Sequence, residues 1–414
     1  MSLRQPARES ATQRKDLLAG RSVWQAGTGT GVPFKPLVAS LRADIAIVGA
    51  GISGAFLAHA LAGRADRIVV VDRRSPVSGS TAASTAMLQF EIDVPLIRLS
   101  DKIGAEKAKR AWLESYRATQ DIVRLVRAER IACGLETRNA LYLTGNTLGH
   151  RAMEREWRAR HRIGLPGRFL PQAQLREEFR IDRSGGILSP GSAAANPRQL
   201  AAGLLRRSIA KGVEVYAPVT ITDVLATAHG TVLATDRHFI EARRCVFCTG
   251  YELLKGMPRA GTKITSTWAV ASSKASAYPS WMEQTLLWEA AKPYLYMRTT
   301  PDGRILIGGE DEDIDLPSYR VRNLAHKSAR LLQKAKRLVP DLAVDAAFQW
   351  TGAFGESEDG LPIIDAIPDM PGCFAVMGFG GNGTVYSVIA SRIVPALLAG
   401  RRPKNADLYR FRGT

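Results

Sequence analysis

The chain has 414 residues and a formal net charge of +18 at pH 7, with 57 Lys or Arg against 39 Asp or Glu. This length suggests two or three lobes. The hydrophobic content of 45% is enough for a sizeable core and excludes a mostly disordered chain. Four Cys residues in a chain of this length exclude a scaffold held together by disulfides.

The sequence offers no segment suited to crossing a membrane. Its longest nearly uncharged stretch, residues 45–63, contains four Gly and one His, whereas a spanning helix needs about 20 predominantly apolar residues. Residues 1–16 carry charges with no apolar core behind them, so we expect no secretory signal and a cytoplasmic protein.

The positive charge is mostly Arg and is spread along the chain. It is densest in residues 151–168, where Trp157 is the only aromatic residue, so a platform for stacking bases is not indicated. We interpret this stretch as a solvated helical face and expect no specific nucleic-acid partner. An anion-binding or partner-binding surface is the alternative.

The first elements in chain order are an arm and a βαβ unit. Residues 1–40 are polar and rich in Gly and Thr, and predict a poorly ordered arm. From Ala43 the text ADIAIV predicts a strand, residues 52–61 a buried helix, and RIVVVD a second buried strand. A strand, a Gly turn, a helix and a strand within about 30 residues form a βαβ unit.

The later elements alternate between helices and strands. Asn196 and Pro197 are typical of a helix start, and Gly212 of its end. The turn Pro301-Asp302-Gly303 predicts a hairpin within residues 261–310, which read as β-structure. Other predicted elements are an amphipathic helix at 105–131, strands at 213–224, 231–236 and 245–250, a basic helix at 324–338, and a strand at 373–378 followed by a helix.

The sequence Gly49-Ala-Gly51-Ile52-Ser53-Gly54 lies between the first strand and the first buried helix. In this context it predicts a dinucleotide site. Gly49 permits the tight turn, Gly51 lets a pyrophosphate approach the backbone, and Gly54 lets the helix pack on the strand. The helix N-terminus at Ile52 and Ser53 presents unpaired N–H groups to the phosphates.

An acidic residue follows at the position where such sites bind a ribose. Asp72 ends the second strand, 18 residues after Gly54, and we expect its carboxylate to accept from the ribose hydroxyls. A 2′-phosphate would be repelled by Asp72, although Arg73 and Arg74 stand beside it as further candidates for contact with the cofactor.

Two more pieces resemble parts of a nucleotide fold. Thr249 and Gly250 end a buried strand in mid-chain, and a second Gly-rich turn follows a strand near the C-terminus, at Gly380, Gly381, Asn382, Gly383 and Thr384. A fold assembled from three separated pieces suits FAD, and a helix N-terminus at the last turn would stabilise the negative charge of a reduced flavin. An NAD-linked dehydrogenase is the alternative.

Together these segments resemble the flavin-dependent amine and amino-acid oxidoreductases of the D-amino-acid-oxidase-like superfamily. The resemblance covers ADIAIVGAGISG, VVVDRR, GSTAASTAMLQFEID, VFCTGYE, KPYLYMRTTPDGRILIGGED, WTGAFGESEDGLP and MGFGGNGTVYSVIA. It implies non-covalent FAD and transfer of a hydride from the C–H beside an amine nitrogen to flavin N5, giving an imine. The electron acceptor stays unknown.

The resemblance also implies further cofactor contacts. It makes the segment after residue 78 a loop that binds phosphate and ring, and it places the strand near Val219 against the adenine. The residues implied in that loop are Gly79, Ser80, Thr81, Ser84, Thr85 and Ala86.

The expected fold class is α/β, with a Rossmann-like FAD-binding domain and a substrate-binding α+β lobe built on a mixed or antiparallel sheet. The expected bounds are an N-terminal arm at 1–40, the FAD-binding domain at 41–98, 185–260 and 346–414, and the substrate-binding domain at 99–184 and 261–345.

On the substrate side, strand alternation puts Tyr294, Tyr296 and Arg298 on one face. We predict that the guanidinium of Arg298 binds a substrate carboxylate through two N–H donors, with Tyr296 beside it. The alternative is that Arg298 forms a structural salt bridge. Gln89 and Glu91 share a face just after the cofactor loop, and Glu91 is a candidate to accept an ammonium or act as a base, or else is structural.

One departure from the family pattern concerns the carboxylate. Many amino-acid oxidases of this superfamily carry an Arg in the segment that here reads Trp350-Thr-Gly-Ala-Phe354, which has none. Either Arg298 takes that role or the substrate is an amine without an α-carboxylate. The pair Cys245 and Cys248 is interpreted as buried structural thiols, no metal site is expected, and a flavoprotein serving an RNA or protein partner is a further alternative.

Overall fold

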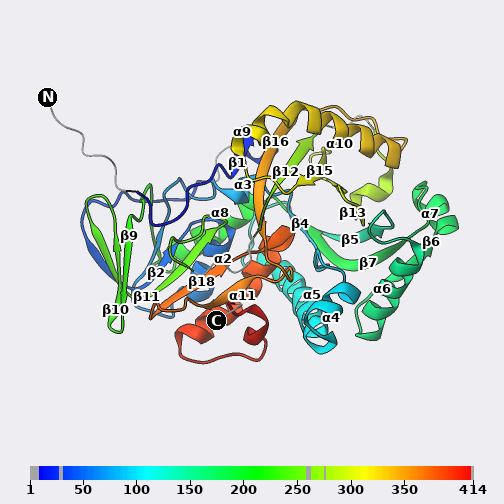
Figure 1. Cartoon of the computed structure of the whole chain (residues 1–414). Helices are drawn as coiled ribbons and strands as arrows, with labels where there is room; N and C mark the ends of the chain where they lie inside the picture. Colours follow the sequence, from blue (N-terminus) through cyan, green and yellow to red (C-terminus); the bar gives the residue numbers. More distant parts are fainter. Residues whose placement is uncertain (1–8, 28–30, 258–262, 275–276, 412–414) are drawn as a thin grey trace.

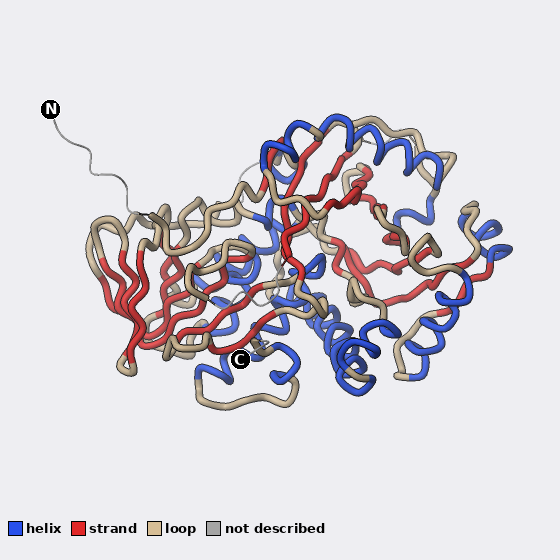
Figure 2. Tube along the Cα trace, viewed as in Figure 1, coloured by secondary structure: helices blue, strands red, loops and turns tan. Residues whose placement is uncertain are grey.

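The computed structural model describes residues 9–27, 31–257, 263–274 and 277–411. Two β-sheets form the cores of two lobes that lie side by side (Figure 1). Strands run through the interior of each lobe, and most helices lie on the outside (Figure 2). The predicted α/β class is confirmed.

The first sheet has eight strands and a Rossmann-like centre, in which β2 pairs in parallel with β3 and with β11. β18 and β8 extend it in parallel on the two sides. The strands are β2 (Leu41–Val48), β3 (Ile68–Val71), β8 (Glu214–Tyr216), β9 (Asp223–Thr227), β10 (Gly230–Ala234), β11 (Phe239–Gly250), β17 (Ile363–Ala366) and β18 (Cys373–Met377).

Three helices pack together beside this sheet, with α2 in contact with both α8 and α11. The long helix α5 contacts α11 from the other side and reaches toward the second lobe (Figure 1). Their apolar side chains, such as Phe56, Leu204 and Ile389, join the sheet in one buried core. The helices are α2 (Ile52–Leu61), α4 (Leu96–Ile103), α5 (Ala105–Ala128), α8 (Pro197–Ile209) and α11 (Gly383–Leu398), with the 3₁₀ turns η2 (Gly380–Asn382) and η3 (Ala406–Tyr409).

The second sheet has ten strands, in the order β1-β16-β12-β15-β14-β13-β5-β7-β4 with β6 beside β7. Every pair is antiparallel except β13 with β5. The strands are β1 (Leu18–Gly20), β4 (Met87–Leu88), β5 (Glu136–Leu143), β6 (Arg168–Pro171), β7 (Gly185–Ala194), β12 (Lys263–Ala271), β13 (Thr285–Glu289), β14 (Leu295–Thr299), β15 (Ile305–Glu312) and β16 (Phe348–Glu356).

Helices cover the second sheet above and at its far end (Figure 1). α10 packs on β12, β14, β15 and β16, and buries Trp268 and Leu331 in a second core. The helices and turns of this lobe are α1 (Val23–Ala26), α3 (Ser80–Ala83), α6 (His150–Arg162), α7 (Gln172–Phe179), α9 (Pro317–Arg322), α10 (Leu324–Leu338) and η1 (Ser280–Glu283). Within the described ranges, no helix is both long and apolar enough to span a bilayer.

Several predicted elements are confirmed. α10 spans the predicted residues 324–338, and the hairpin at Pro301–Gly303 joins β14 to β15. The Asn196 side chain caps α8 by accepting from the backbone N–H groups of Arg198 and Gln199. Two helix ends come earlier than predicted, because α5 stops at Ala128 and α8 at Ile209, three residues before Gly212.

The structure corrects the expected bounds at three strands. β4, β7 and β16 fall within the ranges expected for the FAD-binding domain, yet all three belong to the second sheet. The reason is pairing with partners distant in the chain: β7 pairs with β5, and β16 pairs with β12 over nine residue pairs. Three segments that were expected in the FAD-binding domain therefore contribute strands to the second sheet.

The N-terminal arm is also different from the prediction. Residues 9–27, here called the N-terminal strap, are ordered against the rest of the protein. Thr12 forms a bridge with Leu254, β1 pairs with β16, and the Trp24 side chain is buried. Residues 1–8 and 28–30 of the predicted arm lie outside the described residues.

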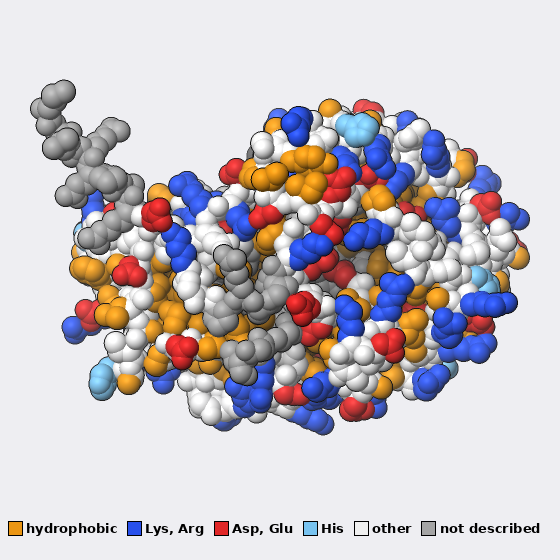
Figure 3. Space-filling model, viewed as in Figure 1, with side chains coloured by type: hydrophobic (Ala, Val, Ile, Leu, Met, Phe, Trp, Pro, Cys, Tyr) orange, Lys and Arg blue, Asp and Glu red, His pale blue; other side chains and the backbone are white. Residues whose placement is uncertain are grey.

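The basic helix α6 is not a fully solvated face. Lys and Arg side chains are scattered over the surface in Figure 3. Arg160, however, turns inward: it is 2% exposed, donates to Glu156 at 2.7 Å and lies over the ring of Trp112. One residue of the predicted charged patch is therefore part of the core.

Candidate active site

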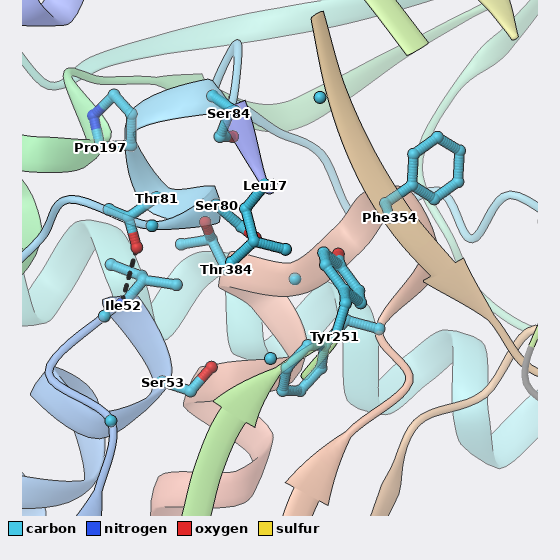
Figure 4. A pocket seen from close by; sticks show the side chains of 18 of the residues that line it. Leu17, Ile52, Ser53, Ser80, Thr81, Ser84, Pro197, Tyr251, Phe354 and Thr384 are labelled. Atoms are coloured by element: carbon cyan, nitrogen blue, oxygen red, sulfur yellow. Dashed lines mark hydrogen bonds between the residues drawn. The ribbon is translucent and has the colours of Figure 1, made fainter. Parts of the chain in front are cut away.

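One continuous cavity connects the two lobes. It begins beside Ser10 and Thr12 of the N-terminal strap, passes the first Gly-rich turn, and ends among Trp288 and Tyr296 of the second sheet. Figure 4 shows its middle part, where α3, the start of α2 and the start of α11 converge. The three separated pieces that the sequence assigned to one nucleotide site thus do meet around one space.

The glycines of the first turn are required by close backbone contacts. Gly49 has φ +115°, and a Cβ there would lie 2.3 Å from the carbonyl oxygen of Cys248. A Cβ on Gly54 would lie 1.8 Å from the carbonyl oxygen of Gly49. Gly51 faces Thr81, whose hydroxyl accepts from the N–H of Ile52 at 2.9 Å (Figure 4). The N-terminus of α2 therefore opens on the cavity, together with Ser53.

Asp72 lies on the cavity at the end of β3. Its carboxylate accepts from the backbone N–H groups of Ala50 and Arg74, at 2.7 and 2.8 Å. Burial raises the pKa of Asp72. The carboxylate thus ties the Gly-rich turn to the strand end, and its contact with a ribose stays a prediction.

Arg73 and Arg74 also line the cavity, but both are paired with Glu252. Arg74 donates to the two oxygens of Glu252 at 2.8 Å each, and Arg73 lies 2.5 Å from it. Glu252 is 3% exposed and also accepts from the N–H of Lys15 at 2.9 Å. Sequence reasoning missed Glu252, although it lies only two residues after the predicted Thr249-Gly250 strand end.

The predicted loop residues lie together on the cavity wall. α3 carries Ser80, which Figure 4 shows beside Thr384, and Thr81, whose hydroxyl points to the N–H of Ile52. Two hydroxyls on the wall, Ser80 Oγ and Thr249 Oγ1, are buried and have no hydrogen-bond partner among the described residues. The predicted residues found on the wall here are Gly79, Ser80, Thr81, Ser84, Thr85, Ala86, Val219, Thr249 and Gly250.

Unpaired buried hydroxyls and exposed backbone N–H groups suit a ligand rich in phosphate and hydroxyl oxygens. The described residues therefore fit FAD.

The C-terminal turn closes the opposite wall. Gly380, Gly381, Asn382, Gly383 and Thr384 all border the cavity, as predicted. The N–H of Gly381 donates to Asp93 at 2.7 Å, and the Asn382 side chain donates to the carbonyl oxygen of Glu91 at 2.6 Å. These bonds fix the start of α11, whose N-terminus faces the cavity.

Aromatic and polar side chains form the end of the cavity in the second lobe. Trp288 stacks on Tyr142 at 3.7 Å between ring centroids, and Tyr294 and Tyr296 lie beside it. Burial raises the pKa of Tyr296, which keeps its phenol protonated. Gln89 and Asp93 border the same end. Trp268 is in the core instead, where its indole N–H donates to the carbonyl oxygen of Arg320 at 3.2 Å.

Arg298 is not placed to bind a substrate carboxylate, and that interpretation needs correction. Its guanidinium is buried outside the cavity wall and donates to the carbonyl oxygens of Thr85, Ala195 and Thr299 at 2.7, 2.8 and 3.1 Å. Strand alternation assigned the correct face, but the side chain lies beneath the cofactor loop. Arg298 supports that loop.

Glu91 is likewise behind the wall. It is fully buried, and its carboxylate lies 3.9 Å from Arg160. Neither carboxylate oxygen has a hydrogen-bond partner among the described residues, and burial raises the pKa of the group. Its placement does not fit direct contact with a substrate, whereas Gln89 does border the cavity.

The four Cys residues are all free thiols in the described structure. Cys245 and Cys248 lie in two different hydrophobic cores, as opposite faces of β11 require, and both are free. In the part of the chain that the structure describes, no group of three His, Cys, Asp or Glu side chains could hold a metal ion.

Known oxidoreductases are similar to this chain in sequence and in fold. The glycine oxidase of Geobacillus kaustophilus is 25% identical over 386 residues, which cover 89% of this chain and 96% of that protein. Its crystal structure superposes with a TM-score of 0.73, covering 90% of this chain and 99% of the other, at 23% identity. The gamma-glutamylputrescine oxidoreductase of Escherichia coli is 23% identical over 394 residues, 92% of this chain and 89% of that protein.

A family model settles the wider assignment. The model described as FAD dependent oxidoreductase matches residues 44–397, which include both Gly-rich turns, the cofactor loop and the whole second sheet except β1. The chain therefore belongs to the family of FAD-dependent oxidoreductases, with FAD as its cofactor.

Proposed function

We propose that this enzyme oxidises the C–N bond of a small amine or amino acid to an imine. The observation that carries the proposal is the single cavity that joins the nucleotide site to an aromatic pocket in the second lobe. The names of the relatives, a glycine oxidase and a gamma-glutamylputrescine oxidoreductase, support an amino compound as the substrate. Bound FAD would accept the hydride that the substrate carbon loses.

The protein's own residues would hold the two reactants. The turn at Gly49–Gly54 and the loop hydroxyls of Ser80 and Thr81 would bind the pyrophosphate, and Asp72 the ribose. The N-terminus of α11, with the N–H groups at Gly380–Gly383, would stabilise negative charge at the reacting end of the cofactor. These roles rest on residues that border the cavity.

The second lobe would orient the substrate and accept its proton. Tyr294, Tyr296 and Trp288 form an aromatic wall that excludes water, and a fixed wall keeps the reacting carbon in one orientation. Asp93 is exposed to the cavity, and its surroundings raise the pKa of its carboxyl by desolvation. Its carboxylate is placed to accept the proton that an ammonium must lose before oxidation.

The test is anaerobic reduction of the purified protein. We expect the FAD-loaded enzyme to show visible flavin absorption that an amine panel bleaches without added cofactor. A preparation that stays colourless after incubation with excess FAD, or one that oxidises amines only with added NAD, would contradict the proposal. Admitting oxygen or a quinone after bleaching then identifies the electron acceptor.

A further inference from the structure

We propose that the aromatic end of the cavity selects a cationic amine that carries no carboxylate on the reacting carbon. The proposal rests on the function proposed above and names its substrate class. The amine would lie between Asp93, Gln89 and the aromatic wall.

Among the described residues, no basic side chain borders the cavity at this end to pair with a substrate carboxylate. The basic side chains on its wall are Arg73 and Arg74, which lie at the opposite end and are paired with Glu252. Two other arginines near this end are turned away. The guanidinium of Arg298 donates its N–H groups to backbone carbonyl oxygens beneath the cofactor loop. Arg160 lies over the rings of Trp112 and Tyr142 and is enclosed behind them.

Carboxylates, in contrast, gather at this end. Asp93 borders the cavity, and its Oδ2 accepts from Gly381 while no hydrogen bond to Oδ1 occurs among the described residues. Asp311 lies against Tyr294 and Thr267, two residues of the cavity wall. Burial raises the pKa of Asp311 and of Glu356 to about 7 in each case, and the nearby charge of Asp93 adds to both shifts, while the exposed Lys263 and Lys292, both paired with Asp313, lower that of Glu356. A cation would relieve this repulsion.

Gln89 gives a second and independent indication of a ligand. Its side chain is 6% exposed and borders the cavity, yet its Oε1 has no hydrogen-bond partner among the described residues. The indole N–H of Trp288 on the same wall is a buried donor that also lacks a partner there, and it suits an acceptor atom elsewhere on the ligand rather than the ammonium. Buried polar atoms normally find partners, so an acceptor left open at this point favours a donor such as an ammonium.

The chemistry follows from these contacts. An ammonium would be bound by Asp93 and by the Gln89 acceptor, while its alkyl part packs on Trp288 and Tyr296. The carboxylate of an α-amino acid would face Asp93 with no basic side chain beside it on the described wall, and a like charge left uncompensated inside a cavity is unfavourable. The same cavity would therefore discriminate between an amine and its α-carboxylated counterpart.

The experiment titrates the FAD-loaded enzyme anaerobically with two matched pairs, phenethylamine with phenylalanine and isobutylamine with valine, while the flavin spectrum is recorded. We expect the amine of each pair to perturb the spectrum with an apparent Kd lower by about tenfold or more. In Asp93→Asn, this preference should fall by about tenfold, because one charge-assisted contact is lost. Glu177→Gln, an exposed charge removal on α7, is the matched control.

The possible outcomes are distinct. Equal or tighter binding of the amino acids, or no binding by any amine tested, overturns the substrate assignment. Amines that bind without bleaching the flavin would leave the assignment standing and refute the proposed oxidation. If Asp93→Asn fails to retain FAD, Gln89→Met supplies the same test, and an unchanged preference in that variant counts against the proposal.

Discussion

Replacing Arg298 by Met tests whether this side chain supports the cofactor loop rather than the substrate. The side chain is 1% exposed and donates to three carbonyl oxygens, those of Thr85, Ala195 and Thr299. A buried carbonyl that loses its donor costs about 1–3 kcal/mol. Burial also lowers the pKa of Arg298 to about 9, so removing the buried cation offsets part of that loss. We expect a net decrease of about 3 kcal/mol in the free energy of unfolding.

Two measurements check this expectation. Urea unfolding of the FAD-loaded variant gives the free energy of unfolding, and dialysis gives its FAD affinity, which should fall because Thr85 belongs to the cofactor loop. Arg180→Met is the control: Arg180 is an exposed arginine paired with Asp341, and its loss should change stability by about 0.5 kcal/mol or less.

The refuting result is a selective effect on substrates. If Arg298→Met keeps the parental free energy of unfolding and FAD affinity, yet raises KM for amino acids and not for plain amines, then the guanidinium reaches the substrate. The supporting role would then be wrong.

Three further results are expected. Gly54→Ala should abolish FAD retention, since its Cβ would meet the Gly49 oxygen at 1.8 Å, whereas Gly149→Ala, with open space around it, should bind FAD normally; equal FAD content in both would contradict the contact. Asp72→Ala should lose FAD during dialysis, and full retention would count against its ribose role. Amine affinity should rise from pH 6 to pH 8, because Asp311 and Glu356, with pKa values raised to about 7, gain negative charge over that range. Asp311→Asn should make this profile shallower, with Glu356 still titrating, and a parent enzyme with a flat profile would refute the electrostatic argument.

The nucleotide half was predictable because its requirements are local. Gly49 adopts a backbone conformation that disfavours other residues, and Gly54 leaves room for one carbonyl oxygen. The positions of these glycines in the sequence therefore indicate the turn directly. The cap at Asn196 is local in the same way. A short sequence window holds all the information that such features need.

The substrate half was less predictable because depth and pairing are not local. Alternation along β14 gave the face of Arg298 but not whether that point of the face meets the cavity or the cofactor loop above it. Gln89 and Glu91 were expected on one strand face, yet β4 ends at Leu88 and the chain beyond it is irregular. Asp93 was missed because nothing in the sequence shows that it meets Gly381.

The N-terminal strap has a consequence for how the enzyme is made. Leu18 pairs with Gly352, more than 300 positions away, and Thr12 with Leu254. During synthesis the strap can complete its pairing only after β16 has left the ribosome, so the part of the cavity wall at Leu17, next to β1, is closed late. This stretch of the wall is thus one of the last to be completed, since residue 356 must be made first in a chain of 414 residues.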